Sequence, residues 1–141
     1  MRVIDDLIEC RFFSVHFESE QSRIEIKFVS PWDGSFSLLK VEGVYQFQMS
    51  EVCLENIVDQ LLVFNAIEAE VSNVDYLNSL RGCLSLAQLS DNVLLKNSIS
   101  VIKSQSLMLL HLTSVIGASV TCLARGYSLE SMAQMDDQSM I

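Results

Sequence analysis

The stretch LKVEGVYQFQM, residues 39–49, decides the fold because apolar side chains occupy every second position along most of it. Charged and amide side chains fill most of the positions between them. Successive side chains of a strand point to opposite faces of a sheet, so this period of two is typical of a half-buried strand. Gly43 falls on the apolar parity without a side chain to bury, which predicts a bulge or a bend there.

Two shorter stretches with the same alternation precede this strand, at residues 13–18 and 24–28. The polar sequence ESEQS, residues 18–22, connects them. A connection this short predicts an antiparallel hairpin.

The sequence FVSPWDGSF, residues 28–36, leads from the second strand to the third. Pro31 cannot donate a backbone hydrogen bond and ends the strand, while Asp33 and Gly34 favour a turn. The turn does not require Trp32. Its ring either folds back over the sheet edge or stands exposed as an anchor of the kind enriched in protein interfaces, and both readings stay open.

A helix is predicted over residues 51–67. Ser50 can accept a hydrogen bond from an amide of the first turn, and Glu51 complements the helix dipole. Apolar residues then recur at spacings of three and four, as on one face of a helix. They are Val52, Leu54, Ile57, Val58, Leu61, Leu62 and Phe64.

The second half of the chain is less regular. Residues 74–90 have a helical rhythm that predicts a second helix followed by a loop. From Asn97 onward, two or three further strands are predicted, beginning where Ile99 and Val101 alternate with serines. The stretches 107–113 and 118–129 are apolar on both parities, which is typical of central strands.

These elements predict one α+β domain over residues 1–141. We expect a largely antiparallel sheet of about five or six strands in the order β-β-β-α-(α)-β-β, with one or two helices packed on one face. The polar tail from about residue 132 is expected to be disordered.

The expected compartment is the cytoplasm. Residues 1–10 contain two aspartates where a secretory signal would begin its apolar region, so no signal is predicted. Residues 104–124 lack ionised side chains, but their serines and threonines favour two buried strands over a membrane span. The four cysteines sit among apolar neighbours and are predicted to be free, buried thiols: Cys10, Cys53, Cys83 and Cys122.

The formal charge of −9 is concentrated in the first part of the chain, because no Lys or Arg lies between Lys40 and Arg81. Glu51, Glu55 and Asp59 would form one stripe of the predicted helix, where like charges repel. Such a surface either steers a basic partner or is simply a solvated face, and both readings remain open. The candidate partner-binding residues are Trp32, Asp33, Glu42, Glu51, Glu55, Asp59, Glu68, Glu70 and Asp75.

No catalytic, cofactor-binding or metal-ligating residue is predicted, and the protein is not expected to be an enzyme. The sequence has no C-x-x-C or H-E-x-x-H spacing, no phosphate-binding glycine loop and no G-x-S-x-G motif. His16 and His111 are interpreted as structural. Direct nucleic-acid binding is disfavoured, because clusters of Lys and Arg are missing.

The layout resembles small bacterial immunity proteins encoded beside toxins, including those of contact-dependent growth inhibition systems. The resemblance is carried by RIEIKF at 23–28, VEGVYQF at 41–47 and SVIGASVTCLA at 114–124. It implies an acidic protein that covers the active site of a cognate toxin, often a basic nuclease, and that acts as a monomer or homodimer.

A second resemblance is to acidic chaperones of type III secretion effectors, which are similar in length and in strand-helix-strand order. It implies a homodimer that holds an effector segment on apolar patches. The sequence departs from these chaperones at its start, where about ten residues precede the first predicted strand and an N-terminal helix would be expected. A small enzyme of unknown reaction is the third hypothesis.

Overall fold

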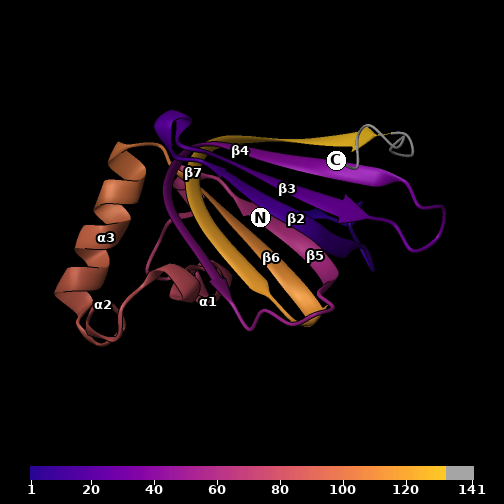
Figure 1. The fold of residues 1–141 in the computed structure, drawn as a ribbon. Coiled ribbons are helices and arrows are strands. Elements are labelled where there is room, and N and C mark those ends of the chain that lie inside the picture. Colours follow the sequence, from indigo (N-terminus) through magenta and orange to yellow (C-terminus); the bar gives the residue numbers. More distant parts are fainter. Residues whose placement is uncertain (133–141) are drawn as a thin grey trace.

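The computed structural model describes residues 1–132 (Figure 1), so nearly all of the predicted disordered tail lies outside the described residues. Seven strands and three α-helices are present in this part of the chain. The strands are β1 (Arg2–Ile4), β2 (Arg11–Glu18), β3 (Arg23–Val29), β4 (Phe36–Ser50), β5 (Ile57–Phe64), β6 (Met108–Ile116) and β7 (Ser119–Met132). The helices are α1 (Val74–Leu80), α2 (Leu86–Ser90) and α3 (Asn92–Ser104).

The α+β class is confirmed, with every strand pair antiparallel. The strand order is β1-β5-β2-β3-β4-β7-β6, and β6 also pairs with β5. The pairing therefore returns to β5, and the sheet curls round on itself. The sheet has one strand more than the upper limit predicted, and there are three helices where one or two were expected.

The first three predicted strands are confirmed as β2, β3 and β4. Ile24 and Ile26 of β3 lie opposite Val41 and Leu39 of β4, which continues the hairpin between β2 and β3. The predicted irregularity at Gly43 is also present. Its φ is +61°, and the register between β4 and β7 shifts just beyond it.

The first hydrophobic core fills the inside of the curled sheet. Phe28, Val58 and Leu61 have no exposed surface, and they pack with apolar residues of the other strands. Residues between β1 and β2 add to this core, since Leu7 and Cys10 are also buried within it. In β3 the inward parity is the apolar parity, since Ile24, Ile26 and Phe28 are buried, whereas the irregular β2 leaves Phe13 and Phe17 exposed.

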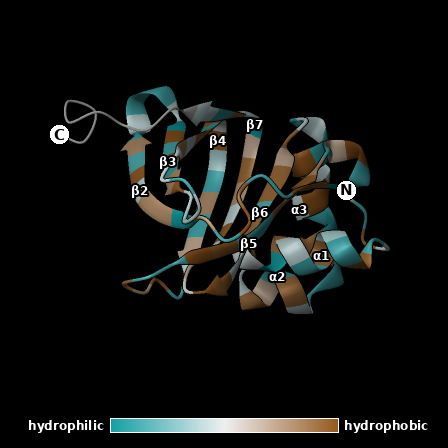
Figure 2. Cartoon of the chain, turned by 90° about the vertical axis from the view of Figure 1, so that its right-hand side faces the viewer, coloured by the Kyte–Doolittle hydropathy of each residue, from teal (hydrophilic) through white to brown (hydrophobic). Residues whose placement is uncertain are grey.

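The second hydrophobic core lies between the outer face of the sheet and the helices, which sit together on one side of it (Figure 2). Leu109 of β6 belongs to this core, whereas its neighbour Leu110 belongs to the first core. The apolar pattern of residues 107–113 predicted a central strand, and this prediction is confirmed, because β6 pairs with β5 and with β7. Within residues 1–132, no helix combines the length and the apolar character needed to cross a bilayer.

The predicted helix over residues 51–67 is wrong. Residues 57–64 form β5, and residues 51–56 are a loop. The register between β5 and β6 shifts twice, between Ile57 and Val58 and between Val58 and Gln60. These irregularities bring Val58 and Leu61, three residues apart, into the same core. The buried residues of a bulged strand can therefore recur at the three-residue spacing that is typical of a helix.

The expected loop and strand around residues 97–101 are also wrong, because α3 occupies them. Leu95, Ile99 and Ile102 are its buried residues, at spacings of four and three. Asp91 begins the helix by accepting hydrogen bonds from the amides of Val93 and Leu94, at 2.9 and 3.3 Å. The alternation of Ile99 and Val101 with serines reflects the polar side of this helix.

Two polar side chains, His111 and Tyr76, lie between the sheet and α1 in different settings. His111 lies between two hydroxyl groups, with Nδ1 3.0 Å from Ser79 Oγ and Nε2 3.3 Å from Ser119 Oγ. Burial lowers its pKa and favours the neutral ring. Tyr76 is 1% exposed and packs edge-on against Phe64, with ring centroids 5.4 Å apart, but its hydroxyl has no hydrogen-bond partner within the described residues.

We therefore expect Tyr76→Phe to raise the free energy of unfolding by about 1 kcal/mol. The substitution removes a buried hydroxyl that gives up its hydrogen bonds to water on folding and forms no hydrogen bond within the described residues in return. Urea unfolding measures the change. Tyr45→Phe is the matched control, since Tyr45 is largely exposed and its hydroxyl remains hydrated. A lower stability of Tyr76→Phe would show that the hydroxyl does form a stabilising bond.

Candidate functional site

Four connecting segments come together at one end of the curled sheet, toward the right and the bottom of Figure 1 and away from α3. We call them the loop rim, defined as residues 5–13, 30–35, 51–59 and 115–118. Arg11 joins three of them, because it lies opposite Val29 in β3 and Ile57 in β5. The amide of Phe12 also donates to the carbonyl of Asn56 at 3.0 Å. The closure of the sheet therefore assembles the rim.

Asn56 fixes the third and fourth segments of the rim. Its Oδ1 accepts from the amides of Cys53 at 3.0 Å and Ala118 at 2.8 Å, and its Nδ2 donates to the Cys53 carbonyl at 2.8 Å. Gly117 has a φ of +87°, and a Cβ at this position would stand 2.3 Å from Asn56 Oδ1. Only glycine permits both the backbone conformation and this close approach.

The turn between β3 and β4 forms as predicted from Pro31, Asp33 and Gly34. Asp33 Oδ1 accepts from the Ser35 amide at 2.9 Å, and Gly34 has a φ of +69°. Hydrogen bonding from Ser35 lowers the pKa of the Asp33 carboxyl, which keeps it ionised. Trp32 at the tip is 77% exposed, so the reading in which its ring folds back over the sheet edge is wrong.

The loop rim carries most of the chain's negative charge. It contains seven acidic residues and one basic residue, Arg11, for a formal charge of −6 out of −9. Arg11 pairs with Glu55, with Nη2 and Oε1 2.7 Å apart, although both side chains remain about half exposed. The seven acidic residues are Asp5, Asp6, Glu9, Asp33, Glu51, Glu55 and Asp59.

The same rim exposes large apolar side chains beside these carboxylates. Leu54 is fully exposed, and Val52 and Val115 are each 64% exposed. Cys53 lies between the first two and is exposed as well, which corrects the prediction that all four cysteines are buried. The exposed apolar residues of the rim are Ile8, Phe13, Trp32, Val52, Leu54, Val115 and Ile116.

Five of the nine candidate partner-binding residues lie in the rim. They are Trp32, Asp33, Glu51, Glu55 and Asp59. The predicted helical stripe of three acids does not exist, because Glu51 and Glu55 belong to a loop and Asp59 to β5. Tertiary structure brings these three acids close to the other acids of the rim instead.

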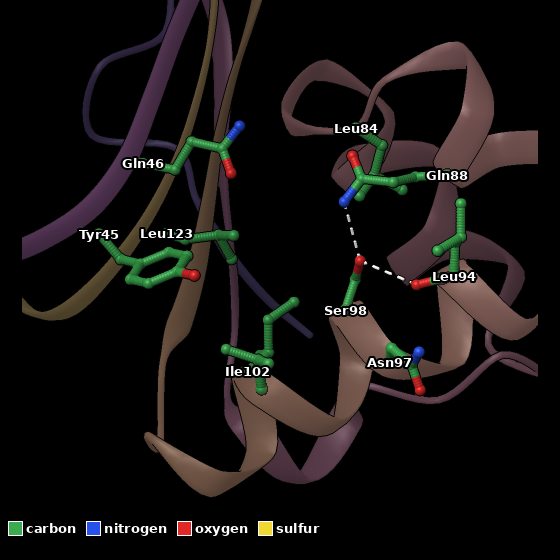
Figure 3. A pocket seen from close by; sticks show the side chains of 10 residues that line it. Tyr45, Gln46, Leu84, Gln88, Leu94, Asn97, Ser98, Ile102 and Leu123 are labelled. Carbon is green, nitrogen blue, oxygen red and sulfur yellow. Dashed lines mark hydrogen bonds between the residues drawn. The ribbon is translucent and has the colours of Figure 1, made fainter.

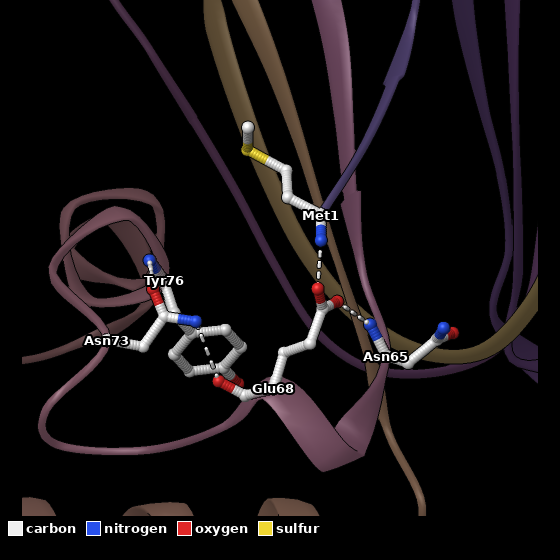
Figure 4. A network of polar contacts seen from close by, with 5 residues as sticks. All are labelled: Met1, Asn65, Glu68, Asn73 and Tyr76. Atoms are coloured by element: carbon white, nitrogen blue, oxygen red, sulfur yellow. Dashed lines mark hydrogen bonds and ion pairs between the residues drawn. The ribbon is translucent and has the colours of Figure 1, made fainter.

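The other four candidates lie elsewhere. Glu68 accepts hydrogen bonds from the Asn65 amide, at 2.8 Å, and from the amino group of Met1, and so has a structural role (Figure 4). Glu70 forms an ion pair with Lys103 at 2.6 Å on the helical side. Asp75 lies in the first turn of α1, and Glu42 is exposed on β4.

The sequence reasoning missed the apolar part of the rim. Val52 and Leu54 had been assigned to the buried face of the helix that does not form, so their exposure could not be anticipated. A usable signal existed at Val115 and Ile116, because Gly117 directly follows them and marks a turn.

The rim offers a surface that is both charged and apolar. Within residues 1–132, no three His, Cys, Asp or Glu side chains lie close enough together to hold a metal ion. Carboxylates interspersed with exposed apolar groups complement a surface that is basic and partly apolar. No protein-family model matches the chain, and no curated protein matches its sequence. Function must therefore be inferred from the rim.

We expect Asn56→Ala to lower the free energy of unfolding by about 2–3 kcal/mol, because three hydrogen bonds are lost and the buried Ala118 amide is left unpaired. Urea unfolding of purified protein is the measurement. Asn78→Ala is the matched control, since Asn78 is exposed on α1, and its effect should stay within about 0.5 kcal/mol. Equal stability of the two variants would contradict the role given to Asn56.

Proposed function

We propose that this protein is an immunity protein that binds and neutralises a cognate bacterial toxin, with the loop rim as its interface. The observation that carries the proposal is the coincidence of a formal charge of −6 and seven exposed apolar side chains at one end of the fold. Isolated exposed apolar residues are common on proteins, but a group of them among carboxylates suits a partner.

The charge of the rim favours fast association with a basic partner. Carboxylates gathered at one end repel each other, which costs stability and needs a compensating use. A field of one sign can raise association rates by about one to three orders of magnitude at low salt. Rapid capture matters for an immunity protein, because it must bind the toxin before the toxin acts.

The apolar side chains of the rim would slow dissociation of the complex. Aromatic anchors such as Trp32 are enriched among residues that contribute most to binding. Its exposure at the tip of a hydrogen-bonded turn lets it enter a pocket on the partner. Charge would thus govern the encounter, and burial of the anchors would govern dissociation.

A basic nuclease is the toxin class that this rim fits best. A nuclease that binds phosphates presents Lys and Arg around its cleft, and carboxylates are the protein groups that pair with these side chains. Occupying the cleft would neutralise the enzyme without any catalytic group on the immunity protein. The proposed place of action is the cytoplasm, where such a toxin would meet nucleic acid.

A chaperone for a secreted effector is the second candidate, favoured by apolar residues exposed on the helices. Leu86 of α2 is 84% exposed and Val93 of α3 is 66% exposed. Such a patch could hold an effector segment or join two copies of the chain.

Co-expression with the product of the adjacent gene is the experiment that tests the proposal. We expect a 1:1 complex, and growth should be restored in cells that make the neighbouring protein. A stable homodimer that carries a secreted effector would instead support the chaperone. Turnover of a small substrate would replace both with an enzyme.

Charge reversal in the rim should slow association with that partner. The triple variant Asp6→Lys, Glu51→Lys and Asp59→Lys leaves the pair of Arg11 and Glu55 intact. We expect a drop in association rate of about tenfold or more at low salt, and the difference from the parent should shrink as salt screens the charges. Stopped-flow mixing measures both effects.

The matched control reverses Glu20, Glu42 and Asp75, which are exposed and outside the rim. The two triple variants change the net charge equally, so a local effect separates them. If both slow association to the same extent, only the net charge of the protein matters and the rim is not the interface.

Trp32→Ala should leave stability within about 0.5 kcal/mol, because the ring is exposed. Removing an anchor from an interface should nevertheless weaken the complex by about thirtyfold or more. Urea unfolding and isothermal titration calorimetry measure the two quantities. Leu86→Ala on α2 serves as the control outside the rim. An unchanged dissociation constant for Trp32→Ala would remove the turn from the interface.

A further inference from the structure

A second feature, separate from the loop rim, is a cavity of about 320 Å³ beside the bend of β4. Arg125 of β7 lines it, and no ion pair within residues 1–132 involves this side chain. Arg2 and Lys96 also line cavities, but Glu68 and Glu70 line those same cavities. In a chain with twice as many acids as bases, a cavity lined by an arginine and no carboxylate stands out.

Gly43 positions the arginine. The Cβ, Cγ and Cδ atoms of Arg125 lie 2.8, 2.9 and 3.0 Å from the place where a Cβ of residue 43 would stand. The aliphatic part of the side chain therefore lies flat across β4 in space that any other residue would fill. The bend of the strand is thus part of how this cavity is built, as well as a feature of the sheet.

The remaining polar groups of the cavity can also donate hydrogen bonds. Ser22 and Tyr45 contribute hydroxyl groups, and Gln105 contributes an amide from the end of α3. The backbone holds Ser22 in place, because its carbonyl accepts from the Val44 amide at 2.8 Å. A cavity lined by one guanidinium, by residues with neutral donor groups and by no carboxylate is a setting that favours an anion.

A second cavity, of about 310 Å³, shares the lining residue Tyr45 with the first. It lies between the sheet and the helices, where Tyr45 and Leu123 face Leu84 and Ile102 across the gap (Figure 3). Apart from the Tyr45 phenol, its lining has no ionisable side chain. Its polar side chains are partly engaged with one another, as when Gln88 donates to Ser98 at 2.9 Å.

We propose that the two cavities form one binding site for a small carboxylate with an apolar body. The carboxylate pairs with Arg125, and the body extends past Tyr45 into the space beneath α3. The volume of the second cavity equals that of about ten water molecules and lies at the lower end for ligand sites, so the body is small.

The charge balance selects a carboxylate over a phosphate monoester. One guanidinium neutralises one carboxylate and matches its planar shape. A phosphate monoester carries about −1.5 to −2 charges at pH 7, so part of its charge would remain unpaired in a protein that is already at −9. The site is independent of the proposed toxin interface, because none of its residues belongs to the loop rim.

Calorimetric titration with octanoate tests the proposal. We expect octanoate to bind, and acetate and 1-octanol to bind at least tenfold more weakly because each lacks one half of the ligand. Octyl phosphate should also bind more weakly than octanoate. Equal affinity for octanoate and 1-octanol would overturn the pairing with Arg125, and tighter binding of octyl phosphate would overturn the choice of a carboxylate.

Variants test separately where the carboxylate and the apolar body of the ligand bind. Arg125→Gln should weaken octanoate binding by about tenfold to a hundredfold, because a charged hydrogen bond is lost. Arg2→Gln, the same substitution in another cavity, should change it less than twofold. Asn97→Trp, at an exposed position of α3 that lines the second cavity, should block the body. Circular dichroism checks that each variant is folded, and undiminished binding in folded Arg125→Gln or Asn97→Trp would overturn the proposal.

Discussion

The pairing of β5 on both of its edges is the constraint on which the structure depends. One edge pairs with β6, and the other pairs with β1 and with the start of β2. This double pairing closes the sheet on itself and encloses the first core. It leaves the outer faces of β5, β6 and β7 to be covered by helices, which produces the second core. The loop rim is a further consequence, because closure brings the start of β2 beside the start of β5.

Closure also explains where the two candidate sites lie. The rim combines acids that are distant in sequence, such as Glu9 and Asp59, with exposed apolar side chains of the connecting segments, such as Leu54. The Arg125 cavity forms on the other side of the fold, where β4 bends at Gly43 and α3 ends. The two candidate sites differ in charge and share no residue.

The sequence predictions were right for elements with a regular alternation of apolar and polar residues, and wrong for elements whose pattern is irregular. The strands β2, β3 and β4 were recognised because apolar and polar side chains alternate along them, as in a half-buried strand. In β2 this alternation did not mark a buried face, because Phe13 and Phe17 are 46% and 56% exposed. The strand β5 was mistaken for a helix because its bulges place Val58 and Leu61 on the same side. Helix α3 was mistaken for a strand because Ile99 and Val101 alternate with serines. The residue that shares the buried face of the helix with Ile99 is Leu95, four positions earlier.

The amino-acid sequence by itself determined the α+β class, the turn at Pro31 to Gly34, the bend at Gly43 and the acidity of the first half, since each of these depends on local composition and spacing. Only the tertiary structure decided which acids share a surface, which apolar residues remain exposed, and that Arg125 lies across Gly43. These features depend on pairing between segments far apart in the chain, and local periodicity carries no information about such contacts.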